Sequence, residues 1–82
     1  MLIKEEVKRK VFEKHGVYFE EVKHGFVNGK PVIYKTKEEK YLAITHHHRY
    51  ITIIFTYKDN NANIITAYPS PKWQIRLYKK KN

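Results

Sequence analysis

The stretch Tyr50-Ile51-Thr52-Ile53-Ile54-Phe55-Thr56-Tyr57 decides the fold of this 82-residue chain. Its β-branched and aromatic side chains favour extended backbone, because they pack well on the pleated surface of a sheet. Successive side chains of a strand point to opposite faces, so Ile51, Ile53 and Phe55 share one face and the residues between them share the other. Since both faces carry apolar side chains, the pattern predicts a central strand that is covered on both sides.

Weaker alternating patterns on either side predict that this strand belongs to an antiparallel sheet of three or four strands. Residues 32–35 and 41–45 are expected to form two preceding strands, and residues 63–68 the returning one. The run Lys58-Asp59-Asn60-Asn61 is typical of the tight turn that joins two antiparallel neighbours.

Helical spacing occurs at both ends of the chain. Apolar residues recur every three or four positions in two N-terminal rows, Ile3, Val7, Val11 and then Phe19, Val22, Phe26. Gly16 supplies a left-handed stop between these two helices. Ser70 is the predicted N-cap and Pro71 the predicted first residue of a C-terminal helix. Residues 1–82 are thus expected to form a single α+β domain with the order helix, helix, antiparallel sheet, helix.

The composition limits the functional class. The absence of cysteine excludes disulfides and thiolate–metal sites, and no apolar run approaches the ~18 residues that span a membrane. The N-terminus lacks the layout of a signal peptide, so a cytoplasmic protein without a membrane partner is expected. The net charge of +9 is uneven, because residues 1–41 carry ten Lys/Arg against seven Asp/Glu, and residues 42–82 carry seven against one. This excess predicts a polyanionic partner such as RNA or DNA; the alternative is a surface charged only for solubility.

One segment resembles a known family. Residues 14–21, Lys-His-Gly-Val-Tyr-Phe-Glu-Glu, are similar to the Lys-His-Gly-Val-x-Phe-Glu-Glu segment of the BrnT toxins, which are small ribonucleases of type II toxin–antitoxin pairs related in fold to RelE. Residues 64–67, Ile-Ile-Thr-Ala, are similar to the family's Ile-Ile-Ser-Ala strand, and residues 74–78 to its C-terminal helix. The resemblance implies a RelE-like fold, RNA as the substrate and a cognate antitoxin protein as the partner.

The chain departs from that family at several positions. Nothing like the family's early Trp-Asp pair precedes the first helix, and Val7 and Val11 stand where the family has Lys and Asn. Tyr68 replaces the Arg that follows the family's Ser-Ala pair. Residues 66–73 are more similar to a neighbouring family of small toxin-like domains.

Cleavage of RNA without a metal needs a base for the 2′-hydroxyl, cations for the charged transition state and an acid for the leaving 5′-oxygen. We predict that His15, Arg49, Tyr68 and Arg76 are the catalytic residues. For His15, which lies in the matching segment, the alternative is an interaction with the negative end of its own helix. For Arg49 the alternative is a solvated strand end.

Further cations and histidines are predicted to contact RNA. The nucleic-acid-binding set comprises His46, His48, Lys72, Lys79 and Lys80. The three lysines share one helix face with Arg76, and the alternative for this stripe is a solvated face. His46 and His48 lie in or beside a turn, and an exposed turn is their alternative. They could chelate a metal only with a third ligand, which the neighbouring sequence does not offer, so neither a metal nor another cofactor is predicted.

The aromatic residues are mostly assigned to packing. The residues predicted to lie in the core are Phe12, Phe19, Phe26, Phe55 and Trp73. Tyr41, Tyr50 and Tyr57 are expected to pack across strands rather than to stack on RNA bases.

Three functions fit these observations. The first is an RNA endonuclease toxin that acts without a metal through a basic groove. The second is a non-catalytic nucleic-acid-binding module on the same scaffold. This function would explain the departures from the family at Val7, Val11 and Tyr68. The third is a protein-interaction domain whose basic surface only docks an acidic partner.

Overall fold

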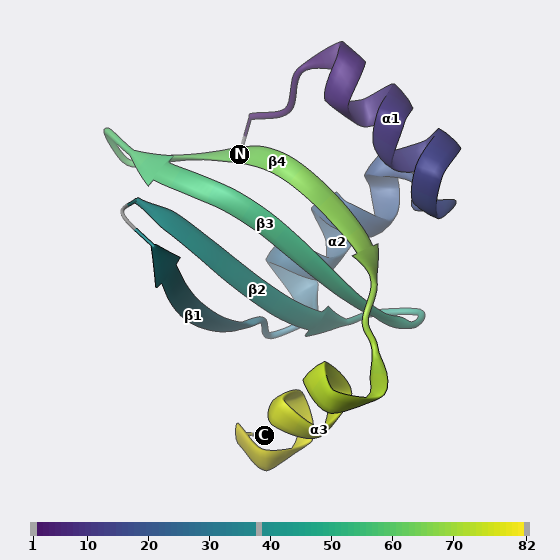
Figure 1. The fold of residues 1–82 in the computed structure, drawn as a ribbon, viewed down its shortest axis with the longest axis vertical. Helices are drawn as coiled ribbons and strands as arrows, with labels where there is room; N and C mark the ends of the chain where they lie inside the picture. Colours follow the sequence, from purple (N-terminus) through teal and green to yellow (C-terminus); the bar gives the residue numbers. More distant parts are fainter. Residues whose placement is uncertain (1, 38, 82) are drawn as a thin grey trace.

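The computed structural model describes residues 2–37 and 39–81, and its elements follow the predicted order (Figure 1). The elements are α1 (Glu5–His15), α2 (Phe19–Asn28), β1 (Val32–Lys37), β2 (Lys40–His46), β3 (Tyr50–Lys58), β4 (Asn61–Pro69) and α3 (Lys72–Lys81). Each strand pairs antiparallel with the next, in the spatial order β1-β2-β3-β4. The α+β prediction is confirmed, and the sheet has four strands.

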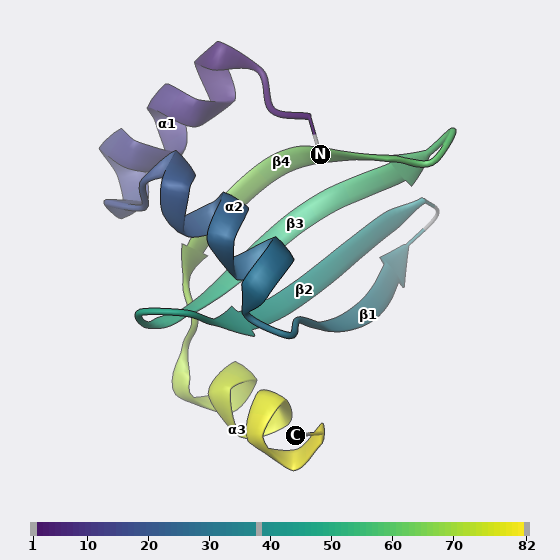
Figure 2. The same ribbon diagram turned by 180° about the vertical axis from the view of Figure 1, so that it is seen from behind.

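Strand β3 is central, as its sequence predicted. It pairs with β2 on one side and β4 on the other, and Ile51, Ile53 and Phe55 are at most 3% exposed. These side chains face α1 and α2, which cover one face of the sheet (Figure 2). The β3–β4 turn has positive φ at Asp59 (53°) and Asn60 (64°), which is the backbone that a two-residue hairpin turn requires.

Glycine allows α2 to approach β2 closely. The Thr45 hydroxyl donates a 2.7 Å hydrogen bond to the carbonyl oxygen of Gly25. A Cβ atom on Gly25 would lie 2.7 Å from Thr45 Cγ2, and one on Gly29 would overlap the Thr45 side chain and lie 2.7 Å from the carbonyl oxygen of Gly25. The end of α2 therefore rests directly on β2. Between the first two helices, Gly16 adopts the predicted left-handed conformation (φ 65°) and donates to the carbonyl oxygen of Phe12.

Helix α3 lies at one end of the sheet and contacts the opposite face (Figure 1). The backbone N–H groups of Gln74 and Ile75 both donate to the carbonyl oxygen of Pro71, and the helix begins at Lys72, so Pro71 precedes the helix rather than occupying its first residue. The prediction that Ser70 is the N-cap of this helix is wrong. The helix begins at Lys72, and the Ser70 hydroxyl instead bonds to the Thr52 hydroxyl on β3 (2.7 Å).

Two of the aromatic residues assigned to the core lie on the surface. Phe12 is 46% exposed and Trp73 is 55% exposed. Phe12 follows the buried Val11 by a single residue, and that step of about 100° turns it away from the sheet. On α3 the position facing the sheet belongs to the buried Gln74, so its neighbour Trp73 points outward. Phe55 is buried, and Phe26 packs against it with ring centroids 5.0 Å apart.

The two edges of the sheet differ. Leu2 runs parallel to β4 and exchanges hydrogen bonds with Ala62 O (2.7 Å) and Ile64 N (2.8 Å). Strand β1 forms the opposite edge and carries the exposed side chains of Lys35 and Lys37. No helix in the described part of the chain is long and apolar enough to cross a membrane.

Candidate functional site at the end of β4

The fold brings two of the predicted catalytic residues together. His15 is the last residue of α1 and Tyr68 lies near the end of β4, and their ring centroids are 6.0 Å apart. His15 is exposed and Tyr68 is half-buried, so a ligand can reach both rings. The pair offers an imidazole, which can accept or donate a proton, beside a phenol that can donate one.

Tyr68 is held in place by a chain of buried hydroxyl and amide groups. Gln74 Nε2 donates to the Tyr68 hydroxyl oxygen (3.1 Å), and Gln74 Oε1 accepts from the Thr52 hydroxyl. Because the single Thr52 proton is used in that bond, Ser70 must be the donor in the 2.7 Å contact between the Ser70 and Thr52 hydroxyls. All donors thus point toward Tyr68, and the phenolic proton is left to donate to another acceptor.

Gln74 was not among the residues selected from the sequence. It is only 2% exposed, although glutamine is usually a surface residue. Its sequence neighbours Trp73 and Ile75 are both more exposed than Gln74. In the sequence, Gln74 and Tyr78 share one face of the predicted helix. This spacing shows that the face carries polar groups, but it does not show that the face is buried.

Arg49 lies in the β2–β3 turn and contacts both α2 and the link between the first two helices. Its Nε and Nη2 atoms donate to the two carboxylate oxygens of Glu21 (2.7 and 3.0 Å), and Nη2 also donates to the carbonyl oxygen of Gly16 (2.8 Å). The hydrogen bond from Arg49 lowers the pKa of Glu21, and the same bond raises the pKa of Arg49. Arg49 therefore contacts the residue that follows His15, with its guanidinium tied mainly to Glu21.

The three consecutive histidines point in different directions. His46 packs on Tyr50 (ring centroids 4.3 Å), whereas His47 stacks on His24 of α2 (5.4 Å). His48 lies near enough to Glu21 that its charge helps to lower the pKa of that carboxyl. Within residues 2–37 and 39–81, no group of three or more His, Asp or Glu side chains is arranged to hold a metal ion.

Tyr50 links two of the predicted RNA-binding residues. Lys79 Nζ lies 5.8 Å from the centroid of its ring, on which His46 also packs. Tyr50 further makes an edge contact with Tyr78, whose hydroxyl donates to the carbonyl oxygen of Gly29 (2.9 Å). The expectation that Tyr50 packs across strands is confirmed, since His46 is its partner in the β2–β3 register. Tyr41 likewise stacks on its cross-strand partner Phe55 (5.5 Å).

The remaining predicted residues lie on the outer side of α3. Lys72, Arg76 and Lys80 are all exposed there. Across the described residues, no hydrogen bond, ion pair or ring contact joins Arg76 to His15, Arg49 or Tyr68. The structure thus brings His15 and Tyr68 together and places Arg49 against Gly16, the residue after His15, whereas Arg76 lies on α3.

The fold is that of a small bacterial ribonuclease toxin. The chain superimposes on the crystal structure of the Brucella abortus ribonuclease toxin BrnT with a TM-score of 0.72, over 88% of this chain and 96% of that one. The two sequences are 17% identical over the aligned residues. No family model and no curated protein sequence matches the chain. The likeness that residues 14–21 indicated is therefore confirmed at the level of the fold.

Proposed function

We propose that this protein is an endoribonuclease toxin of a type II toxin–antitoxin pair. The observation that carries the proposal is the juxtaposition of His15 and Tyr68, 6.0 Å apart and both accessible, on the fold of a ribonuclease toxin. An imidazole and a phenol on opposite sides of a phosphate are suited to general base and general acid catalysis.

In the proposed reaction His15 accepts the proton of a ribose 2′-hydroxyl. The 2′-oxygen then forms a bond to the adjacent phosphorus as the bond from phosphorus to the 5′-oxygen breaks. Tyr68 donates its proton to that leaving oxygen, since the hydrogen bond from Gln74 directs the phenolic proton outward. The products are a 2′,3′-cyclic phosphate and a free 5′-hydroxyl, and no metal ion takes part.

Cations around the pair supply the electrostatic stabilisation. Three N–H groups of Arg49 are occupied by Glu21 and Gly16, so Arg49 contributes through its remaining Nη1 edge and its charge. Arg76 and the RNA-binding residues extend the positive surface along α3 and the β2–β3 turn. The residues proposed to hold the RNA backbone are His46, His48, Lys72, Lys79 and Lys80. An acidic antitoxin in the cytoplasm would compete with RNA for this surface.

The test is cleavage of a fluorophore-labelled RNA by the purified protein in the presence of EDTA. We expect cleavage to persist in EDTA and His15→Ala to slow it about 100-fold, the lower end of what a general base contributes. His47→Ala is the matched control, because His47 stacks on His24 away from Tyr68. If the His15→Ala protein cleaves as fast as the wild type, His15 is not the base.

One observation favours a non-catalytic nucleic-acid-binding module as the second candidate. The guanidinium of Arg49 is committed to Glu21, which reduces what it can offer to a phosphate. This alternative predicts that the wild type binds RNA with an affinity that falls as salt rises, but leaves the RNA intact and does not arrest growth when expressed alone.

A further inference from the structure

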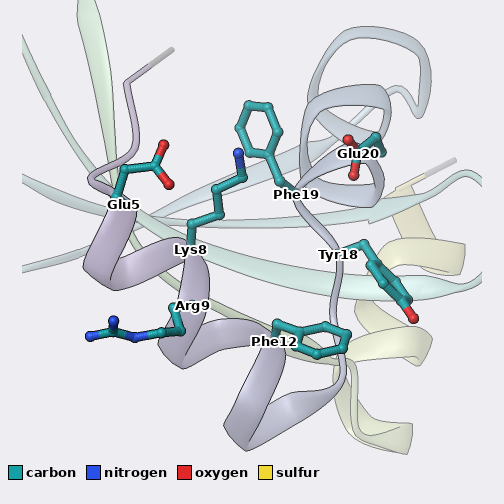
Figure 3. A pocket seen from close by; sticks show the side chains of 7 residues that line it. All are labelled: Glu5, Lys8, Arg9, Phe12, Tyr18, Phe19 and Glu20. Atoms are coloured by element: carbon teal, nitrogen blue, oxygen red, sulfur yellow. The ribbon is translucent and has the colours of Figure 1, made fainter.

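A hollow lies between α1 and the start of α2 (Figure 3). It has a volume of about 350 Å³ and combines aromatic, cationic and acidic side chains. The lining residues are Glu5, Lys8, Arg9, Phe12, Tyr18, Phe19 and Glu20.

Two of its aromatic side chains are unusually open to solvent. Phe12 is 46% exposed and Tyr18 is 57% exposed. Their ring centroids are 4.9 Å apart with an interplanar angle of 51°, so the two rings are tilted against each other rather than stacked face to face. Exposed aromatic faces of this kind are what single-stranded nucleic acids stack on, because every base offers a π-face of similar size.

The polar groups around these rings suit a base better than a protein partner. Lys8 Nζ lies 4.5 Å from the centroid of Phe19, and Arg9 and Glu20 flank Phe12 and Tyr18 (Figure 3). A nucleobase edge carries both donors and acceptors, which matches a rim that holds both cations and carboxylates. An acidic partner would meet Glu5 and Glu20, and a purely apolar one would bury Lys8 and Arg9 without compensation.

The hollow lies one helical turn of α1 from His15. Phe12 and His15 are three residues apart on α1, so their side chains are neighbours on the helix surface. Tyr18 follows Gly16, whose carbonyl oxygen accepts from Arg49. A strand whose phosphate lies between His15 and Tyr68 can therefore reach the hollow with an adjacent nucleotide.

We propose that the hollow between α1 and α2 is a subsite for one unpaired base of single-stranded RNA, next to the phosphate that is cleaved. This inference rests on the proposed function for the identity of the polymer. The base stacks on Phe12 and Tyr18, its edge faces Glu20, and Arg9 contacts the flanking phosphate.

The experiment measures binding without cleavage. Fluorescein-labelled 2′-O-methyl hexanucleotides lack the nucleophilic hydroxyl, and their affinity is followed by fluorescence anisotropy. We expect Phe12→Leu/Tyr18→Leu to bind about tenfold more weakly than the wild type, which is the scale of losing a base–aromatic stack. Tyr57→Leu is the matched control, because Tyr57 is 48% exposed and does not line the hollow. When the abasic site of a hexanucleotide occupies the hollow, no base can stack there. Such a hexanucleotide should bind the wild type and the double variant equally.

A second measurement does not depend on how the double variant folds. Titration of the wild type with nucleoside monophosphates should shift the ring-proton NMR signals of Phe12, Tyr18 and Phe19 more than those of Tyr57. Absence of these shifts, or equal binding of hexanucleotides by a folded double variant and the wild type, overturns the proposal. So does a double variant that loses binding to an antitoxin while its RNA affinity is unchanged, because the hollow then belongs to a protein partner.

The outcome for the proposed function is separate. If the wild type binds the hexanucleotides through Phe12 and Tyr18 but does not cleave ordinary RNA, the base-binding role of the hollow is supported and the catalytic function is overturned. If the wild type cleaves RNA and the double variant binds as tightly, catalysis stands and the subsite falls. A wild type that binds no RNA at all overturns both.

Discussion

The two faces of the sheet are built from different chemistry. The face under α1 and α2 is packed by aliphatic and aromatic side chains, among them Ile53 and Phe55 of β3. The face under α3 buries Ile44 of β2, and it also carries hydrogen-bonded hydroxyl, amide and phenol groups, with Thr52 of β3 bonded to Gln74. Strand β3 supplies side chains to both faces, because its successive side chains point to opposite sides of the sheet. We infer that the first face supplies most of the stability, whereas the second fixes the positions of groups that meet solvent.

The largest effect should come from the apolar face. Ile53→Ala removes a fully buried side chain from the centre of the sheet and should lower the free energy of unfolding by about 3–4 kcal/mol. Urea denaturation followed by circular dichroism measures this. Ile65→Ala is the control, because Ile65 is 39% exposed and should cost well under half as much. Equal costs for the two variants would contradict the central role of the apolar face.

The polar face should show a smaller stability effect and a clear functional one. Gln74→Leu leaves the buried Thr52 hydroxyl without its acceptor and should cost about 1–2 kcal/mol. Because Tyr68 also loses its donor, RNA cleavage should fall about tenfold, the order expected when a catalytic group is less well positioned.

Gln74→Glu sharpens this comparison. The introduced carboxylate keeps an acceptor for Thr52 but removes the amide that donates to Tyr68. Cleavage should therefore fall while the bond to Thr52 is retained, and the pH dependence of kcat should change relative to the wild type. If cleavage follows stability alone across Gln74→Leu, Gln74→Glu and Ile53→Ala, the polar face has no separate positioning role.

The smallest effect should come from the ion pair that joins the helices to the β2–β3 turn. Arg49→Gln should cost about 1 kcal/mol at neutral pH, since the Arg49 side chain is 43% exposed and solvent weakens the pair. The pKa of Glu21 is lowered below 4.5 on folding, chiefly by the hydrogen bond from Arg49. The pair therefore stabilises the fold above pH 4.5, and this contribution is lost as the pH falls through the lower, folded pKa.

Thermal unfolding at several pH values tests whether the stability contributed by the Arg49–Glu21 pair is lost at low pH. The difference in Tm between the wild type and Arg49→Gln should shrink as the pH is lowered below 4.5. A difference that stays constant down to about pH 2.5 would show that Glu21 does not titrate with the pair.

The sequence predicted the order and type of all elements because local signals agreed with one another. The apolar alternation of β3, Gly16 and the Asp59-Asn60 turn are each sufficient to place one boundary. What could not be predicted was which residue of a helix faces the sheet. Trp73 and Gln74 are neighbours, and the larger apolar side chain was expected inside, but α3 packs on Thr52 and selects the amide.

The candidate site was predicted in part for a similar reason. His15 and Tyr68 were selected from the sequence, but their proximity depends on the packing of α1 beside β4, which no local pattern encodes. The pairing of Arg49 with Glu21 spans 28 positions of sequence, and composition gave no reason to choose that carboxylate. The contact of Lys79 with Tyr50 could not be predicted from the sequence either, because it depends on how α3 lies against the start of β3.

The position of Trp73 has a spectroscopic consequence. It is the only tryptophan of the chain, and more than half of its surface meets water in the native state. Its fluorescence emission should already be red-shifted before unfolding, so intrinsic fluorescence will report poorly on the melting of the sheet. Trp73 lies in the first turn of α3, so quenching of its fluorescence will report a ligand that binds at the start of that helix.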